Sequence, residues 1–279
     1  LIRCRLYQKS KIKPINQKNT KIKIFVYKND TAVNTKIPPV EPVKPDGLKA
    51  QGFPMTALEA QRLQHSDKKK AVDLGNGITM AMIRIPAGEF VMGSADGAPD
   101  ERPRSVVRIT EPFWMTVTEV NNAQYAMFDP KHDTRYIDMH GYNRVVPGFI
   151  ANHPNQPVAR VSWLEAIQFC KRMSQKIGLK VTLPTEAQWE WAARAGADTQ
   201  FFYGTMDANF DRFANLADQS LRWLVVRYEG PSMLQLRYPY PPELNFPLHD
   251  ERFRDKWHVV DYCGQMEANA WGLKDMVGN

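Results

Sequence analysis

The chain has 279 residues, of which 43% are apolar and 24% charged, so it can bury a sizeable core and lacks the composition of a disordered protein. No apolar run reaches the length of a membrane-spanning helix or a signal-peptide core, so neither is expected. The net charge of +7 comes from the first 50 residues, where twelve Lys and Arg face three Asp and Glu, which leaves about −2 on the rest.

Residues 1–54 form a basic leader followed by a proline-rich stretch. Lys alternates with Ile between residues 11 and 26, a pattern compatible with a strand, a nucleic-acid-binding arm or a solvated tail. The solvated tail is favoured, because no aromatic interleaving accompanies the charge. We therefore expect a disordered leader and linker over 1–54, no nucleic-acid partner, and one domain over 55–279.

The first elements of that domain are short. Thr56 and Glu59 have the spacing of a capping box, which predicts a helix over 57–65. Apolar residues then alternate across 83–92 around a Pro-Ala-Gly turn, and this pattern predicts a β-hairpin. A further strand is expected around 107–109.

Two helices are expected in the middle of the chain. Thr118 is expected to cap the first, which runs to about Phe128. Ser162 begins a capping box that predicts a helix over 163–177, and Gly178 stands where a left-handed residue would end it.

A third helix is expected to begin after Thr185 and to close at Gly196. Its apolar face should allow another backbone to approach closely, because it combines one large ring with small residues, namely Trp189, Ala192, Ala193 and Gly196. Residues after 197 lose all periodicity, which predicts long loops that need something to hold them.

Six sequence blocks occur in a fixed order: IPAGEFVMGS (85–94), VTEVNNAQY (117–125), PVARVSWLEAIQFC (157–170), LPTEAQWEWAARAG (183–196), FANLAD (213–218) and NAWGLKDMVGN (269–279). In order and style they resemble the formylglycine-generating enzymes, also called sulfatase-modifying factors. The resemblance implies an α+β fold related to C-type lectins, with little regular secondary structure, long loops and bound calcium.

The resemblance also implies calcium ligands. In the family, one ion takes two side-chain oxygens and two backbone carbonyls, and by spacing these positions match Asn215, Leu216, Asp255 and Trp257. Such a mixture of hard oxygen donors suits calcium in irregular loops. A second ion would use Asp275 and the carbonyl of Gly278, with its remaining ligands expected after Asn279.

Alternatives to this first site stay open. The segment 221–254 looks like an insertion, so Asp250 or Glu251 could replace Asp255 as the ligand. Asn215 and Asp255 could also be ordinary turn residues.

Active family members are implied to oxidise a cysteine of a client sulfatase to formylglycine, using molecular oxygen and a copper ion held by two cysteines. This chain has three cysteines, Cys4, Cys170 and Cys263, and Cys170 falls on the apolar face of a predicted helix. The copper-binding pair of the family belongs to a later segment. No residue of this chain is therefore expected to be catalytic, and copper is expected only with that later segment.

A polar cluster in the segment DPKHDTRYIDMHGY (129–142) is a second place where a metal could be imagined. It contains His132, Asp133, Asp138 and His140, but its spacing fits no familiar His and carboxylate pattern. A polar loop is the favoured interpretation.

The sequence thus predicts a formylglycine-generating-enzyme-like domain that is incomplete at its C-terminus. The leading hypothesis is an oxidase, or a close redox relative, that acts on an extended peptide of a sulfatase-like protein. One alternative is a non-catalytic, C-type-lectin-like module that binds a ligand with its loops, including the 221–254 insertion. Another is an inactive truncated fragment. Whether the chain is an enzyme, its compartment, its oligomeric state and the role of the leader stay open.

Overall fold

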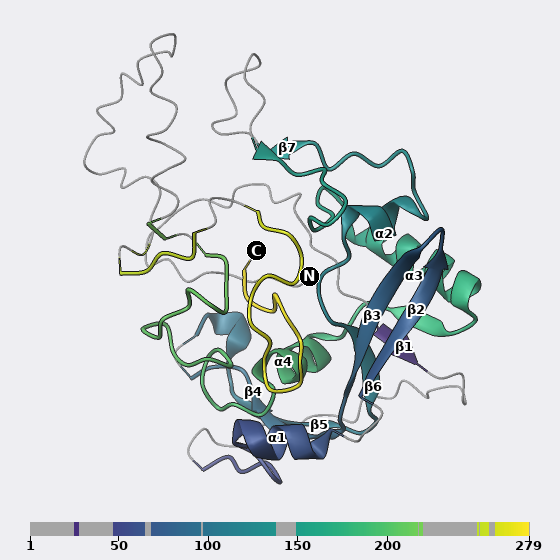
Figure 1. Ribbon diagram of the computed structural model, residues 1–279. Helices are drawn as coiled ribbons and strands as arrows, with labels where there is room; N and C mark the ends of the chain where they lie inside the picture. The colour runs from purple at the N-terminus through teal and green to yellow at the C-terminus, as the bar shows by residue number, and fades with distance from the viewer. Residues whose placement is uncertain are drawn as a thin grey trace, which may run out of the picture.

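The computed structural model describes residues 25–27, 47–64, 68–95, 97–137, 149–216, 218–219, 250, 252–256 and 260–278. Its helices are α1 (Ala57–Leu63), α2 (Asn122–Ala126), α3 (Trp163–Ile177) and α4 (Glu186–Arg194), with a 3₁₀ turn at Pro99–Glu101. Its strands are β1 (Phe25–Tyr27), β2 (Lys69–Gly75), β3 (Ile78–Ile85), β4 (Gly88–Met92), β5 (Ser105–Ile109), β6 (Phe113–Thr116), β7 (Tyr136–Ile137), β8 (Phe149–Ile150) and β9 (Lys180–Thr182). This mixture of helix and sheet is the α+β class that the sequence predicts (Figure 1).

The main sheet has five strands in the order β2-β3-β6-β1-β9, and β4 with β5 forms a separate ribbon. The predicted hairpin over 83–92 is wrong, because β3 pairs with β2 and β6 whereas β4 pairs with β5. The actual hairpin joins β2 to β3 through a turn at Asn76 and Gly77, both of which have positive φ. Asn-Gly is a strong hairpin signal, so this turn was visible in the sequence.

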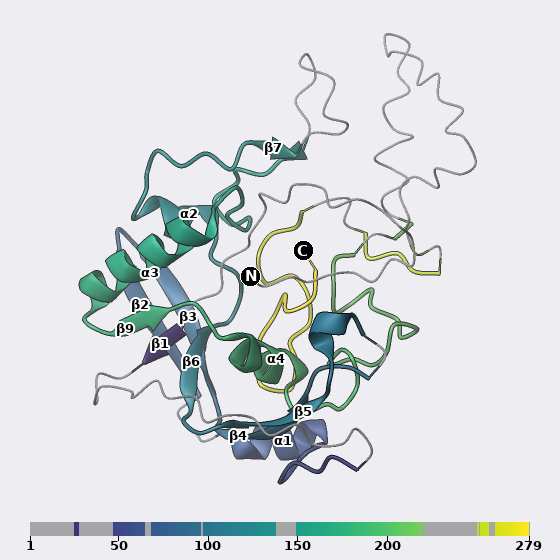
Figure 2. The same cartoon turned by 180° about the vertical axis from the view of Figure 1, so that it is seen from behind.

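The leader supplies a strand to this sheet. β1 lies between β6 and β9 and is antiparallel to both, as the view from behind shows (Figure 2). The proline-rich stretch also meets the domain at its end, since Ala50 is buried and the Gln51 N–H donates to Glu89 Oε2 at 3.0 Å. The rest of the leader lies outside the described residues.

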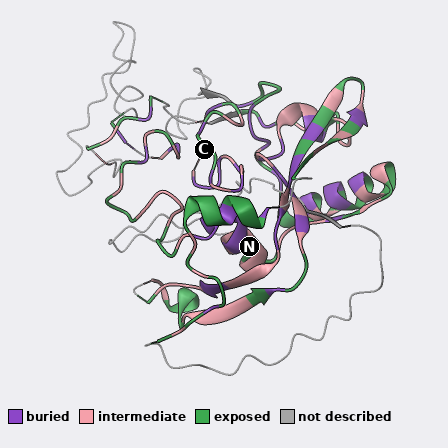
Figure 3. Ribbon diagram, turned by 60° about the horizontal axis from the view of Figure 1, so that its bottom comes forward, coloured by how far each residue is buried: buried purple, intermediate pink, exposed green. Residues whose placement is uncertain are grey.

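Alternation along β3 divides the core between the two faces of the sheet. Met80 and Met82 pack with α2 and α3, whereas Ile83 and Ile85 pack with α1 and α4. The predicted face for Ile83 and Ile85 is therefore correct, although their strand partners are not. Figure 3 shows buried backbone, in purple, continuing from these layers into the loops near the C-terminus.

The helix caps follow local sequence closely. The capping boxes of Thr56, Ser162 and Thr185 all form, and Gly178 ends α3 with φ of 67°. The cap predicted at Thr118 is wrong, because Asn121 caps α2 instead. Asparagine at this position satisfies a free N–H of the first turn as well as threonine would.

The close approach predicted for α4 occurs, but through a different ring. The fully buried ring is Trp191, and a Cβ added to Gly88 would lie 2.8 Å from it. Trp191 Nε1 also donates to the Pro86 carbonyl at 2.9 Å. Trp189, which was expected on this face, only packs at its margin. Gly88 is therefore the small residue that lets the β4 backbone reach α4.

In the described part of the chain after Arg194, no regular helix or strand is formed, as the lost periodicity predicts. These loops are held by a small apolar cluster of Phe210, Ala214 and Val277, ringed by half-buried aromatic side chains. None of the helices described is both long and apolar enough to cross a membrane.

Candidate functional site

Two loop segments, 201–219 and 250–278, meet at the predicted first metal site. Asn215 and Gly278 form an isolated parallel bridge, so the ends of the two segments lie side by side. Gly278 has φ of 74°, and a Cβ placed there would lie 2.1 Å from the Asn215 carbonyl oxygen. Glycine is therefore required at this contact, since any side chain would push the two segments apart.

The carboxylate of Asp255 is directed at the same turn. Its Oδ2 accepts a hydrogen bond from the Leu216 N–H at 3.0 Å, although the two residues are 39 positions apart. The Asp255 N–H donates in turn to Asp218 Oδ2. The side chains of Asn215, Asp218 and Asp255 are all buried. Three buried oxygen-bearing side chains thus gather where the sequence placed an ion.

Asn215, Leu216 and Asp255 of the first predicted site are therefore brought together, whereas Trp257 lies outside the described residues. Gly278, predicted for the second ion, lies against Asn215. Their donors are carboxylate, amide and backbone oxygens, the set that calcium prefers. Among the described residues, no group of three or more His, Cys, Asp or Glu side chains is arranged to hold a metal. An ion here would accordingly need amide and carbonyl oxygens as well as carboxylates, and its presence stays a prediction.

Asp218 was not proposed from the sequence, although it is the most buried acid of the group. It ends the FANLAD block, three residues after Asn215, so its place in a matching block was the available signal. Asp218 is buried beside Asp255, which makes it a better-placed ligand candidate than an exposed acid.

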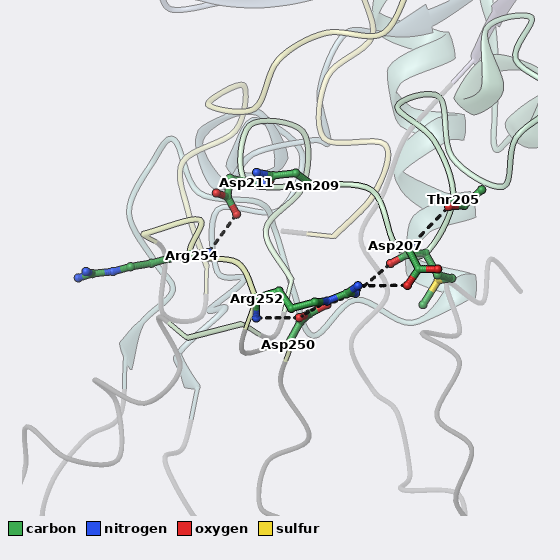
Figure 4. A network of polar contacts seen from close by, with 8 residues as sticks. Thr205, Asp207, Asn209, Asp211, Asp250, Arg252 and Arg254 are labelled. Atoms are coloured by element: carbon green, nitrogen blue, oxygen red, sulfur yellow. Dashed lines mark hydrogen bonds and ion pairs between the residues drawn. The ribbon is translucent and has the colours of Figure 1, made fainter.

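The alternative ligand Asp250 has a different role. Its carboxylate pairs with the Arg252 guanidinium at 2.7 Å, and Arg252 also reaches Asp207 at 3.1 Å, as Figure 4 shows. The Arg254 N–H donates to Asp211 Oδ1 at 3.0 Å in the same network. This network ties the return from the insertion to the 205–211 loop. Glu251, the other alternative, lies outside the described residues.

The second predicted site centres on Asp275, which has a positive φ of 53° and is buried. Its Oδ2 accepts a hydrogen bond from the Gly264 N–H, whereas its buried Oδ1 has no hydrogen-bond partner. Asp261 is buried nearby, and burial, reinforced by the Asp275 charge, raises the pKa of Asp261 to about 6. A buried carboxylate oxygen without a donor is the kind of group that a cation satisfies.

The two cysteines within the described residues form no disulfide, and they lie in α3 and in a loop. Cys170 is buried in α3, and burial raises its pKa to about 12, so it stays a protonated, apolar side chain. Cys263 is half-buried, and its N–H donates to the Asn155 carbonyl at 2.8 Å. Copper(I) prefers thiolates, so the described thiols do not fit a copper site. Cys4 lies outside the described residues.

The described part of the polar cluster near residue 132 is a loop held by hydrogen bonds. His132 Nε2 lies 2.9 Å from the Ala159 carbonyl, and Asp133 accepts hydrogen bonds from Asn152 and from the Arg135 N–H. The Asn152 hydrogen bond lowers the pKa of Asp133. Asp138 and His140 lie outside the described residues.

A separate open groove of about 1000 Å³ runs between the segment leading into α1 and the β4–β5 ribbon. It is lined by both charged and apolar side chains, including Phe53, Arg62, Glu89 and Arg108. None of the predicted metal ligands lines it.

Comparisons with known proteins agree on the family. A family profile described as the Sulfatase-modifying factor enzyme 1-like domain matches residues 73–279. The chain is 30% identical over 259 residues to the formylglycine-generating enzyme of Thermomonospora curvata, which covers 72% of this chain and 70% of that protein. It is also 30% identical over 158 residues to the formylglycine-generating enzyme of Streptomyces coelicolor, covering 42% and 48% respectively.

A relative from Bos taurus, named inactive C-alpha-formylglycine-generating enzyme 2, is 27% identical over 171 residues, or 47% of this chain and 54% of that protein. The chain thus spans about half the length of several curated relatives that it matches. Among solved structures, PvdO from Pseudomonas aeruginosa superimposes with a TM-score of 0.52 at 21% identity, covering 77% of this chain and 73% of PvdO. At that identity the similarity supports the fold alone.

Proposed function

Because this chain belongs to the sulfatase-modifying factor family, we propose that it takes part in formylglycine generation as a calcium-stabilised scaffold that holds a cysteine-bearing segment of a sulfatase-like protein. The observation that supports this most directly is the meeting of two long loops around buried oxygen donors at Asn215, Asp218 and Asp255. Loops that are not paired in a β-sheet need such contacts to fix their conformation before they can present a binding surface.

Calcium has a structural part in this proposal. Asn215, Leu216 and Asp255 would hold one ion, with Asp218 as a further donor, and Asp275 with Gly278 would contribute to a second. The unpartnered Oδ1 of Asp275 favours this second site. A bound ion would supply only positive charge and coordination, while the residues named keep the two loop segments in register.

The oxidation step is not assigned to a described residue. Copper supplies the redox chemistry that the resemblance implies for active members, but Cys170 is protonated and buried and Cys263 stands on another segment. The leading proposal is therefore that this chain binds and orients the client segment, and that conversion of cysteine to formylglycine requires a thiol pair beyond the described cysteines.

A peptide-binding measurement tests the proposal. A fluorescent peptide that spans the modified cysteine of a bacterial sulfatase should bind saturably in an anisotropy titration, and chelation with EGTA should weaken that binding. A scrambled peptide of the same composition is the control. Equal anisotropy with both peptides, or no binding in calcium, would overturn the proposed client recognition.

A non-catalytic binding module is the second candidate, favoured by the similarity to a relative named inactive and by the lack of a fitting copper site among the described residues. The same anisotropy titration separates the two candidates. Binding of the sulfatase peptide without binding of the scrambled peptide supports the client-binding scaffold. Equal binding or no binding of both peptides leaves the module, whose ligand is then not a sulfatase segment.

A further inference from the structure

The open groove beside α1 has walls that are fixed by contacts with the rest of the domain. The segment 51–55 lines the groove, and its Gln51 N–H donates to Glu89 Oε2 on β4 at 3.0 Å. At the other end of this segment, the Met55 N–H donates to the Gly196 carbonyl at 2.9 Å. A groove with walls held in this way is formed before any ligand binds, as most binding sites are.

Apolar side chains along this groove keep part of their surface exposed. Leu63, at the end of α1, is 38% exposed, and Phe53 and Met55 are half-buried. The Phe53 ring lies edge-on to the buried Phe90 ring, with the centroids 6.4 Å apart. These side chains therefore offer apolar contact surface to a ligand in the groove.

The two carboxylates that line the groove are already hydrogen-bonded. Glu59 belongs to the capping box of α1, where its Oε2 accepts from the Thr56 N–H at 2.8 Å, and this hydrogen bond lowers the pKa of Glu59. Glu89 accepts from the Gln51 N–H and from Arg108, and the hydrogen bond from Gln51 lowers the pKa of Glu89 most. Both carboxylates are therefore ionised at neutral pH, and both have partners within the domain.

The arginines that line the groove keep donors for a ligand. Arg62 is exposed and makes no hydrogen bond or ion pair with any residue in the described part of the chain, although Glu59 interacts with it electrostatically. Arg108 Nε and Nη2 both contact Glu89 Oε1, which holds that guanidinium in place. The whole planar fork of Arg62 is thus left to bind a carboxylate, with the remaining N–H groups of Arg108 as further donors.

We propose that this groove binds an extended segment of a partner protein in which one acidic side chain stands between apolar ones, with its carboxylate on Arg62. The three apolar side chains of the groove would contact the apolar neighbours of that acid. At about 1000 Å³ the groove is as large as the largest small-molecule sites and is open, so it accommodates several residues of a chain. Nucleic acid fits poorly, because Glu59 and Glu89 balance the charge of the two arginines.

A peptide with a single acidic residue tests this site on the whole chain. In an anisotropy titration, a labelled peptide with a central Leu-Asp-Leu in a Gly-Ser background should bind saturably, and Asn in place of its Asp should weaken binding about tenfold. Arg62→Glu should weaken binding of the Asp peptide by about tenfold or more, and should restore binding when the peptide carries Lys in place of Asp. Because none of the predicted metal ligands lines the groove, EGTA should leave this binding unchanged.

Lys171→Glu is the matched control, because it makes the same change of charge at an exposed position of α3 outside the groove. It should change the affinity by less than about twofold. No saturable binding of the Asp peptide, or equal binding of the Asp and Asn peptides, would overturn the site. Equal losses in the two variants would reduce binding to overall charge, and weaker binding in EGTA would move it to the metal loops, so either result contradicts the groove. The sulfatase peptide tests the function proposed above separately.

Discussion

The region up to Arg194 and the region after it are stabilised in different ways. The first has strands paired in register and helices with capping boxes, so regular main-chain ladders and caps satisfy its backbone groups. The second has no regular elements among its described residues and depends on side chains that reach distant backbone, such as Asp255 bonded to the Leu216 N–H. Loss of one side chain should therefore cost more in the second region than in the first.

The largest expected loss of stability is at Asn269. Its buried side chain hydrogen-bonds backbone groups of both regions, which no described strand pairing joins at this point. Its Nδ2 donates to the carbonyls of Ala192 and Ala193 at 2.8 and 3.2 Å, and its Oδ1 accepts from the N–H groups of Trp271 and Leu273, both at 3.1 Å. Asn269→Ala should lower the free energy of unfolding by about 3 kcal/mol or more, since buried backbone groups are left unsatisfied. Urea denaturation measures this loss.

Gln265→Ala is the matched control, because Gln265 is exposed in the same segment. Its effect should stay within about 0.5 kcal/mol. Equal losses for the two variants would mean that hydrogen bonds to distant backbone do not hold this region.

Calcium should give the next largest effect, confined to the loop region. At a hundredfold excess over its dissociation constant, calcium should raise the free energy of unfolding by about 2.7 kcal/mol, and EGTA should remove the gain. Asp255→Asn should remove the part of this gain that comes from the first ion, because the neutral amide loses the charge that faces the Asn215–Leu216 turn. Thermal melts with calcium and with EGTA follow both.

Asp250→Asn provides the comparison, because Asp250 is already paired with Arg252. It should keep the calcium response. Loss of the response in Asp250→Asn alone would move the ion to the alternative ligand, and no response in the unmodified chain would remove the site.

A helix cap in the first region should matter less. In α2, Asn121 Oδ1 accepts a hydrogen bond from the Gln124 N–H at 2.8 Å. Asn121→Ala removes this cap and should lower the free energy of unfolding by about 1 kcal/mol. Thr118→Ala should cost less, because the Thr118 hydroxyl donates to the Glu119 carbonyl and caps no helix. Chemical denaturation of both variants decides which residue caps α2. A larger loss of stability in Thr118→Ala than in Asn121→Ala would contradict the assignment of the cap to Asn121.

The smallest effect concerns pH and the buried end of α4. Burial raises the pKa of Glu190 above 4.5, although Arg194 and the Gly93 N–H oppose the shift. The folded state thus keeps this proton to higher pH than the unfolded chain. The free energy of unfolding should fall as pH rises from about 4.5 through the folded pKa and then level off.

Glu190→Gln should flatten that dependence, as urea denaturation between pH 4.5 and 7 would show. Glu186→Gln, at the exposed start of the same helix, should reduce it much less, because the Glu186 charge raises the pKa of Glu190 by less than burial does. An unaltered slope in Glu190→Gln would contradict the assignment.

Comparison of the predictions with the structure at particular residues shows which structural features depend on neighbouring residues alone. Ser162 and Gly178 set the ends of α3 as expected, because a cap and a left-handed stop depend on neighbours within a few positions. The partners of β3 and β4 were mistaken, because alternation shows which face a strand buries but not which strand lies beside it. Asp218 and Asn269 were missed, because the partners Asp255, Ala192 and Ala193 lie 37, 77 and 76 positions away. Asp261 was missed, because its burial follows only from the fold.

The sequence by itself determined the family, the α+β class and the positions of three capping boxes, since blocks of neighbouring residues encode them. Only the tertiary structure decided that Asp255 meets the Leu216 turn, that Trp191 meets Gly88, and that the leader supplies a strand of the main sheet. These contacts join segments separated by tens of residues, and no local preference specifies them. They form because buried backbone and carboxylate groups must find partners once the chain has collapsed around its core.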